Sequence, residues 1–269
     1  MKIILFLNND IHAATALRHL LPTLKQHDFR IILSQKVGNI TGLPQELIEM
    51  GRIERDGVKK FLDKAKSSSE SGSHSENKVT NHSGSDHKHL PALAAGSITS
   101  HLDINSDEAI ADLKNFAPDL FISIRFGQIF KQPLINIPRH GVLNLHSGIL
   151  PDYRGVMASF WAILNGAKKL GTTLHYISDS GIDTGEIISF SESEIDPNSS
   201  LVLNINHLYQ AGCGLITQAL EKISAGEKIT TIDQKTLGDG GYFSYPKEGD
   251  VKKFLALMPL VRDGDLDRI

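Results

Sequence analysis

Residues 143–155 read LNLHSGILPDYRG, an apolar run that carries Asn144 and His146 and reaches Pro151 just before a charged turn. Side chains alternate along a β-strand, so residues two positions apart point to the same side. The spacing therefore predicts that Asn144 and His146 face one common space at the end of a hydrophobic strand. In a fold that opens a cleft at that strand end, the pair is a candidate active site.

The segments around this stretch predict the rest of the sheet. Short runs rich in Ile, Leu, Val and Phe recur along the chain, with helical stretches between them. Strands that are apolar on both faces and alternate with helices indicate a doubly wound, mainly parallel α/β fold. Pro22 is expected to kink or split the first helix. Strands are expected at 2–7, 29–34, 119–124, 141–146, 172–177 and 185–190, and helices at 12–27, 106–116, 157–164 and about 203–224.

Composition and charge exclude two classes of partner. The 269 residues are 40% hydrophobic and 22% charged, which is typical of a globular protein. The formal net charge is −3 and no run of Lys or Arg occurs, so nucleic acid is not expected as a partner. The apolar run near the N-terminus is too short for a signal peptide or a membrane span, and the single cysteine, Cys213, fits a reducing compartment. We therefore expect a cytoplasmic protein with no membrane partner.

A polar segment at 66–90 interrupts the α/β pattern. It is rich in Ser, His, Asn and Gly and has few apolar residues to bury, so a mobile surface loop is expected. Its histidines are irregularly spaced and no cysteine accompanies them, which favours a solvated loop over a metal site. These histidines are His74, His82, His87 and His89.

A second segment brings further polar residues to the same cleft. Ligands of open α/β sheets bind beyond the carboxyl ends of the strands, where Asn144 and His146 are expected. The run at 171–188 predicts another strand, with Thr173 and His175 on one side, followed by a loop that holds Asp183. An amide donor, an imidazole and a carboxylate suit acyl transfer to an amine without a covalent intermediate. Ordinary packing and turn-forming roles for these residues remain the alternative.

Motifs between 116 and 190 resemble the signature of the folate-dependent formyltransferases. That family includes glycinamide ribonucleotide, methionyl-tRNA and sugar-nucleotide N-formyltransferases. Order and spacing are kept, and the motifs are highly specific as a set. The matching motifs are Asn144-Leu-His146-Ser, Leu150-Pro151, Tyr153-Arg154-Gly155, Gly171-Thr-Thr173-Leu-His175 and Asp183-Thr-Gly185.

The resemblance implies an enzyme of one-carbon metabolism with a Rossmann-like fold, in which Asn144, His146 and Asp183 are catalytic. It also implies 10-formyltetrahydrofolate as co-substrate, with its pterin against the backbone of the loops at 125–130 and 179–183; the expected mechanism needs no metal. A catalytic domain is expected at 1–228 and a short C-terminal extension at 229–269. The residues expected to bind the co-substrate are Phe126, Gly127, Gln128, Ile129, Asp179, Ser180 and Gly181.

Departures from the family pattern narrow the range of acceptor molecules that we expect. Glycinamide ribonucleotide enzymes resemble one another in a glycine-rich turn that cradles a phosphate after the first strand. Here the turn at 8–11 has no glycine, and Asp10 is expected to repel a phosphate. The short extension and the acidic net charge disfavour tRNA. A primary amine of a small acceptor remains, such as a nucleotide-linked amino sugar or an amino-acid derivative. Tyr242, Phe243 and Tyr245 are expected to pack on the domain, with capping of the acceptor cleft as the alternative.

Two other functions stay open. A non-catalytic folate-binding or regulatory protein could have the same fold, although the three retained polar residues argue against it. The Asp-Thr-Gly at 183–185 also resembles the aspartic proteases, which need two carboxylates in an all-β fold. Only one copy occurs here, within an α/β pattern. The identity of the amine and the oligomeric state are not predicted.

Overall fold

The protein is built around one seven-stranded sheet. Its structure is a computed structural model that describes residues 1–34, 41–70 and 98–269. The strand order is β3-β2-β1-β4-β5-β7-β8; the first five strands of this order pair in parallel, whereas β7 is antiparallel to both of its neighbours. This confirms the predicted doubly wound, mainly parallel α/β fold. The strands are β1 (Lys2–Leu7), β2 (Asp28–Leu33), β3 (Ile98–Thr99), β4 (Leu120–Ile124), β5 (Val142–His146), β7 (Lys169–Tyr176) and β8 (Ile187–Glu194).

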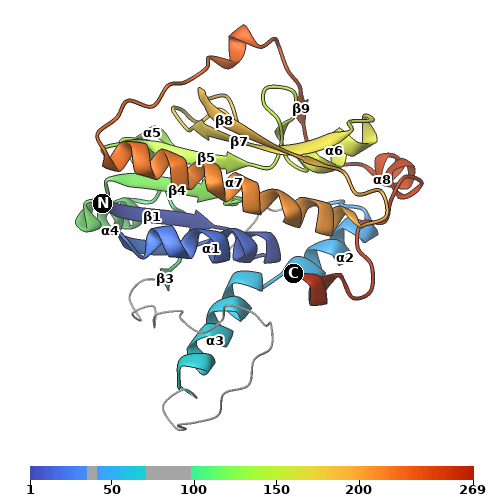
Figure 1. Ribbon diagram of the computed structural model, residues 1–269, viewed down its shortest axis with the longest axis horizontal. Helices are drawn as coiled ribbons and strands as arrows, with labels where there is room; N and C mark the ends of the chain where they lie inside the picture. Colours follow the sequence, from blue (N-terminus) through green and yellow to red (C-terminus); the bar gives the residue numbers. More distant parts are fainter. Residues whose placement is uncertain (35–40, 71–97) are drawn as a thin grey trace, which may run out of the picture.

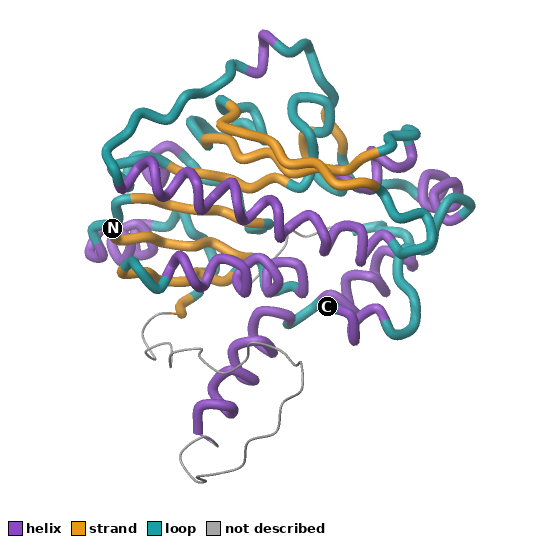
Figure 2. Tube along the Cα trace, in the orientation of Figure 1, coloured by secondary structure: helices purple, strands orange, loops and turns teal. Residues whose placement is uncertain are grey.

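Helices cover both faces of the sheet (Figures 1 and 2). Helices α1 (Ile11–Leu24) and α7 (Leu201–Ser224) pack side by side on one face, while α4 (Asp107–Phe116) and the short α5 (Gln132–Ile135) cover the other. Alternate residues of β1 belong to the two hydrophobic cores, which explains why that strand is apolar throughout. The other helices are α2 (Gln45–Glu54), α3 (Gly57–Glu70), α6 (Ala158–Leu164) and α8 (Glu248–Leu255).

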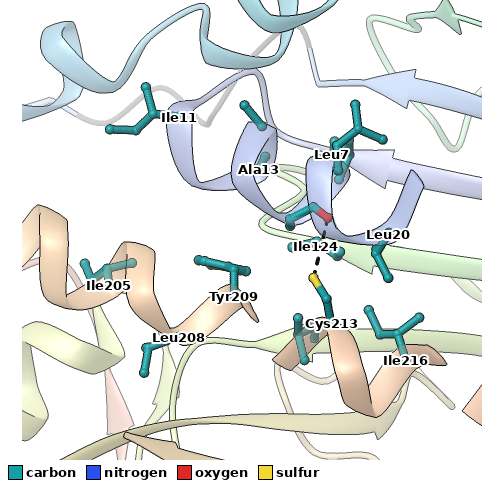
Figure 3. Close-up of a cluster of buried hydrophobic side chains, with 14 of the residues drawn as sticks. Leu7, Ile11, Ala13, Leu20, Ile124, Ile205, Leu208, Tyr209, Cys213 and Ile216 are labelled. Carbon is teal, nitrogen blue, oxygen red and sulfur yellow. Dashed lines mark hydrogen bonds between the residues drawn. The ribbon is translucent and has the colours of Figure 1, made fainter. Parts of the chain in front are cut away.

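The interface between α1 and α7 forms the centre of the larger core. Figure 3 shows Ile205, Tyr209 and Cys213 of α7 directed toward α1. The Cys213 thiol donates to the carbonyl oxygen of Ala16 at 3.5 Å. Burial raises the pKa of Cys213 to about 12, so this thiol stays protonated and unreactive. Cys213 thus lies buried within the helix expected at about 203–224.

A short second sheet attaches the C-terminal segment to the main body. Strand β6 (Arg154–Gly155) pairs in parallel with β9 (Tyr242–Phe243). Between α7 and β9 the chain runs as an open loop with one 3₁₀ turn (Figure 2). The Phe243 ring stacks on Tyr153 at a centroid distance of 5.6 Å and on Trp161 at 5.2 Å. Phe243 therefore packs on the domain as predicted, whereas Tyr242 is 62% exposed.

Two expectations about local structure are corrected. Helix α1 continues through Pro22, so the split that was one of the two expected outcomes does not occur. The proline lies in its last turn, and Arg18, whose carbonyl loses its intrahelical donor, lies on the exposed side, where water can replace the hydrogen bond. The polar segment expected as a loop at 66–90 begins inside α3, which extends to Glu70. The remainder of that segment, with its four histidines, lies outside the described residues.

The direction of strand order reverses between β1 and β4. From β1 the sheet grows toward β2 and β3 on one side, and toward β4, β5, β7 and β8 on the other. Doubly wound sheets bind ligands in the crevice at the carboxyl ends of the strands flanking such a reversal. Within the described part of the chain, no helix is long and apolar enough to cross a membrane.

Candidate active site

A cleft of about 1000 Å³ opens at this reversal. Its lining includes the turn after β1, the loop after β4, the end of β5 and the loop after β7. Asn144 and His146 of β5 both line it, as the alternation along the strand predicted. Strand β7 runs antiparallel to β5 and places His175 opposite Asn144 and Thr173 opposite His146. Thr173 and His175, which were predicted to share one side of their strand, thus lie next to His146 and Asn144.

Asp183 joins these residues from the loop between β7 and β8. It has a left-handed backbone conformation (φ 54°), which is uncommon for a residue other than glycine and is found at functional sites. Its Oδ2 accepts from the Gly155 amide at 2.9 Å and lies 3.5 Å from His146 Nδ1. Its Oδ1 lies 3.4 Å from Asn144 Nδ2 and 3.5 Å from His175 Nε2. The Asp183 carboxylate therefore contacts residues of β5, β6 and β7.

The charge state of Asp183 follows from these contacts. Burial alone would raise the pKa of Asp183, but attraction to the nearby His146 and the hydrogen bond from the Gly155 N–H lower it to about 2. The carboxylate is therefore ionised at neutral pH. A group with so low a pKa is a poor proton acceptor, so Asp183 is suited to orienting and stabilising positive charge.

The two imidazoles have distinct hydrogen-bond partners. His146 Nε2 lies 2.7 Å from the carbonyl oxygen of Tyr153, which can only accept, so Nε2 carries a proton. Asp183 Oδ2 lies beside Nδ1, so the carboxylate and the Tyr153 carbonyl oxygen together fix the orientation of the His146 ring. His175 Nδ1 donates in the same way to the Tyr176 carbonyl oxygen at 2.8 Å, which leaves Nε2 to accept from Asn144 Nδ2 at 3.0 Å. His175 thereby orients the Asn144 amide.

The loop after β4, expected to contact the co-substrate, is fixed by its own side chains. Phe126 packs edge-on against Phe6 and Phe130 at 5.2 and 5.7 Å. The Gln128 side chain accepts from the Ile104 amide and donates to the His101 carbonyl oxygen. These contacts direct the side chains into the body. The positions of this loop that line the cleft include all four expected ones, Phe126, Gly127, Gln128 and Ile129.

The loop after β7 behaves similarly. Asp179 Oδ1 accepts from the Gly181 amide at 2.7 Å and closes a tight turn. Asp179 and Gly181 line the cleft, whereas Ser180 is exposed and is not among the residues that line it. Ser180 is thus the one expected co-substrate residue that the structure leaves outside the cleft.

The turn after β1 differs from expectation. Asp10 lines the cleft, but its carboxylate does not present a free negative charge. Its Oδ1 caps α1 by accepting from the Ala13 amide at 2.8 Å, and its Oδ2 accepts from Asn8 Nδ2 and Arg125 Nε, each at 2.8 Å. The repulsion expected between Asp10 and an acceptor phosphate is therefore largely compensated by Arg125, a residue far away in the sequence.

Several residues of the cleft were not predicted as site residues. His175 could have been found from its place two residues after Thr173 in the strand that pairs with β5. Glu54 lines the cleft from α2, a helix that the sequence did not predict because its apolar pattern is weak. Arg125, the ion-pair partner of Glu54, was considered only as the first residue of a loop. Tyr245 lines the cleft from the C-terminal segment, which realises the capping alternative for that tyrosine. Among the described residues, no group of three or more His, Cys, Asp or Glu side chains could hold a metal ion.

Curated proteins similar to this chain are methionyl-tRNA formyltransferases. The enzyme of Geobacter sulfurreducens is 33% identical over 128 residues, which are 48% of this chain and 40% of that protein. The enzyme of Clostridium novyi is 39% identical over 129 residues, which are 47% of this chain and 40% of that protein. The matched region thus spans less than half the length of these relatives.

Solved structures of formyltransferases have the same fold. An N-formyltransferase from Helicobacter canadensis, in complex with folinic acid and dTDP-3-aminofucose, has a TM-score of 0.54 and 20% identity, covering 93% of this chain and 72% of that one. Glycinamide ribonucleotide transformylase 1 from Symbiobacterium toebii has a TM-score of 0.57 and 15% identity, covering 84% and 88%. The family model described as formyl transferase matches residues 56–220, more than half of the sequence. This chain belongs to the formyl transferase family.

Proposed function

We propose that this protein is an N-formyltransferase that moves the formyl group of 10-formyltetrahydrofolate to a primary amine of a small acceptor. The observation that carries the proposal is the convergence of Asn144, His146 and Asp183 in the cleft, from two separate parts of the chain. The family membership of the chain supports the reaction class. The similar Helicobacter canadensis enzyme, solved with folinic acid and an amino-sugar nucleotide, supports the choice of donor and of a small acceptor.

The reaction needs one bond formed, one bond broken and one proton moved. The amine nitrogen attacks the formyl carbon, negative charge develops on the formyl oxygen, and the bond from carbon to N10 of the folate then breaks. The proton lost by the amine ends on N10. A hydrogen-bond donor and a positive charge near the formyl oxygen stabilise the intermediate. In the proposed mechanism Asn144 is the donor and protonated His146 supplies the charge.

Asp183 and His175 have supporting roles in this mechanism. The ionised carboxylate of Asp183 holds His146 in its charged form and fixes its ring. His175 holds the Asn144 amide by accepting one of its hydrogens. We propose that the folate pterin lies against the backbone of the loops at 125–130 and 179–183, because the side chains there are largely committed to internal contacts. No step of the proposed mechanism requires a metal ion.

Methionyl-tRNA is a second candidate acceptor. The specific observation in its favour is the 33–39% identity to methionyl-tRNA formyltransferases over the matched 47–48% of this chain. A small amine is favoured by the net charge of −3, since a tRNA-binding surface is normally rich in Lys and Arg.

The test is an assay of tetrahydrofolate release from 10-formyltetrahydrofolate with a panel of acceptors. The panel includes nucleotide-linked amino sugars, amino acids and their derivatives, glycinamide ribonucleotide and methionyl-tRNA. We expect amine-dependent release with a small acceptor. Folate binding without release for every acceptor would support the non-catalytic alternative, and efficient formylation of methionyl-tRNA alone would establish the second candidate.

A further inference from the structure

Arg125 lies at the point where the sheet reverses its strand order. It follows β4 directly, one residue beyond the pairs that Ile124 makes with Leu7 of β1 and Leu145 of β5. Its backbone has a left-handed conformation (φ 57°), which costs a residue other than glycine conformational energy and is found where function requires it. Arg125 begins the loop at 125–130, but its side chain turns back toward Asp10 in the turn after β1. Arg125 is thus placed on the acceptor side of the cleft.

Two buried carboxylates, those of Asp10 and Glu54, bind the guanidinium of Arg125. Nε donates to Asp10 at 2.8 Å, and one terminal nitrogen lies 3.6 Å from Glu54 Oε2. Both carboxylates are themselves occupied, since Asp10 caps α1 and Glu54 Oε1 lies 3.2 Å from His12. Burial opposes the charge of Arg125, but Asp10 and Glu54 raise its pKa well above the ordinary value. The result is a permanently charged, rigidly oriented guanidinium.

The terminal edge of this guanidinium is open to the cleft. The Arg125 side chain is 23% exposed, whereas those of Asp10 and Glu54 are 5% and 9% exposed. Nε donates to Asp10, and the terminal nitrogens interact with Glu54 and with the hydroxyl of the buried Tyr209 on the side away from the solvent. Tyr245 lines the same part of the cleft, and the charges of Arg125 and Glu54 both act on its hydroxyl. The edge therefore offers several N–H donors, with a phenolic hydroxyl nearby.

A guanidinium edge of this kind binds planar oxyanions through paired hydrogen bonds. Asp10 and Glu54 outweigh the single charge of Arg125, so a ligand with two negative charges is penalised more than a ligand with one. This favours a carboxylate over a terminal phosphate. Strands β1, β4 and β5 are neighbours in the sheet. The guanidinium edge of Arg125 therefore lies about one to two strand spacings, on the order of 5–10 Å, from the end of β5. Only a few bonds can separate the carboxylate from the reacting amine.

We infer that Arg125 binds a carboxylate group of the acceptor and so selects amines that carry an acid close to the amino group. This inference rests on the proposed function, because it names a second functional group of the acceptor whose amine is formylated. Glu54 and Asp10 act as positioning residues for Arg125, and Tyr245 is a second donor to the same group.

The experiment measures binding of matched acid and amide pairs to the full chain with 5-formyltetrahydrofolate bound. The probes are glycine and glycinamide, β-alanine and β-alaninamide, and L-serine and L-serinamide, with dissociation constants from ligand-observed NMR titration. We expect the acid of at least one pair to bind tenfold or more tightly than its amide. Arg125→Met should abolish this preference. The control Arg52→Met removes a 60%-exposed arginine of α2 that pairs only with Glu49 within the described residues, and should leave the preference intact.

Two further variants protect the test against misfolding. Arg125→Lys keeps the charge but loses the paired donors, and should reduce the preference at least threefold. Tyr245→Phe leaves both ion pairs in place and should also reduce it. An equal or weaker affinity of the acid in every pair, or a preference that survives in Arg125→Met and Arg125→Lys, would overturn the inference. Tetrahydrofolate release is measured in a separate assay. If formyl transfer fails but the protein still prefers the acids in a way that depends on Arg125, the result counts against the proposed function and not against the carboxylate site.

Discussion

At the scale of single residues, the candidate site is organised by one carboxylate that cannot serve as the base. Asp183 contacts His146, His175 and Asn144, and its pKa of about 2 keeps it ionised across the physiological range. In the proposed mechanism, the proton of the attacking amine therefore leaves by another route, such as water, and ends on N10. The proposed contribution of Asp183 is to hold positive charge next to the developing oxyanion.

Replacing Asp183 by Asn should lower kcat on the order of 10²–10³-fold, because a neutral amide no longer stabilises protonated His146. The dissociation constant of 5-formyltetrahydrofolate should change by less than about threefold, since the proposed pterin contacts are to loop backbone. Steady-state kinetics and a fluorescence titration measure the two quantities. The matched control is Asp267→Asn, which changes an exposed carboxylate that does not line the cleft. A variant of Asp183 that keeps more than half of kcat would remove it from the mechanism.

The same carboxylate should make stability depend on pH in the acid range. The folded pKa of about 2 lies below the ordinary value of 3.8, so the ionised group stabilises the fold above about pH 4, and this contribution is lost as the pH falls toward 2. From the two pKa values, its loss between pH 6 and pH 3 is on the order of 1 kcal/mol. Urea unfolding at both pH values should show this extra loss in the wild type relative to Asp183→Asn. Parallel curves for the two proteins would contradict the assignment.

The alternation of side chains along a strand was sufficient to predict Asn144 and His146, because strand periodicity is a local property. Arg125, Asp10 and Glu54 could not be grouped in the same way. Their ion pairs join residues 71 and 115 positions apart in the sequence, and only the order of the strands brings them together. The expectation that Asp10 repels phosphate did not take its pairing with Arg125 into account, because that partner could not be identified from neighbouring residues.

At the scale of elements, the pairing of β6 with β9 connects the C-terminal segment to the candidate site. The Gly155 amide donates to Asp183, and the same residue has a φ of 95° and approaches β9 closely. A Cβ atom at this position would lie 2.2 Å from the carbonyl oxygen of Phe243. The glycine is therefore required both by its backbone conformation and by the close approach of β9.

Gly155→Ala should displace β9 and weaken the contact with Asp183. We expect a loss of about 1–3 kcal/mol in the free energy of unfolding and at least a tenfold lower kcat. The matched control is Gly166→Ala, which has a similar positive φ of 82° but no atom within 4 Å of the added Cβ. That control should lose stability through backbone strain alone and keep its kcat. Equal kcat losses in the two variants would show that β9 does not support the site.

Two glycines of α7 allow a second matched comparison. A Cβ at Gly212 would lie 2.8 Å from Thr172 Oγ1 and 3.1 Å from a methyl group of Leu145, whereas at Gly214 nothing lies within 4 Å. Gly214→Ala should raise the free energy of unfolding by up to about 1 kcal/mol through helix propensity. Gly212→Ala should lower it, because α7 must move away from β5 and β7. Thermal and urea unfolding measure both; stabilisation by Gly212→Ala would contradict the described packing of α7.

The elements with strong periodicity were those that the sequence predicted best. Strands β1, β4 and β5 and helices α4 and α7 lie within two residues of their expected bounds, because each combines a buried apolar face with clear turn or capping residues. Helices α2 and α3 were missed, since both are rich in charged residues and only one side of α2 is buried. The antiparallel pairing of β7 and β8 is a property of long-range topology that their composition does not encode.

At the scale of the whole molecule, the reversal of strand order places two chemically different regions in one cleft. The loops at 126–130 and 179–183 border the side proposed for folate, and the turn after β1 with the Arg125 side chain borders the side proposed for the acceptor. Asn144 and His146 lie at the end of β5, within reach of both regions. The central claim is that these residues transfer a formyl group between ligands held on either side.

The most direct test follows the formyl group itself. The protein is incubated with 10-formyltetrahydrofolate labelled with ¹³C in the formyl carbon, together with the acceptor that gives the highest rate of tetrahydrofolate release, and the label is followed by NMR. The wild-type protein should move the label from the folate to the amine as a formamide, and His146→Ala should bind the folate but leave the label on it. Appearance of the label as free formate only, or transfer to the amine at the wild-type rate by His146→Ala, would contradict the account.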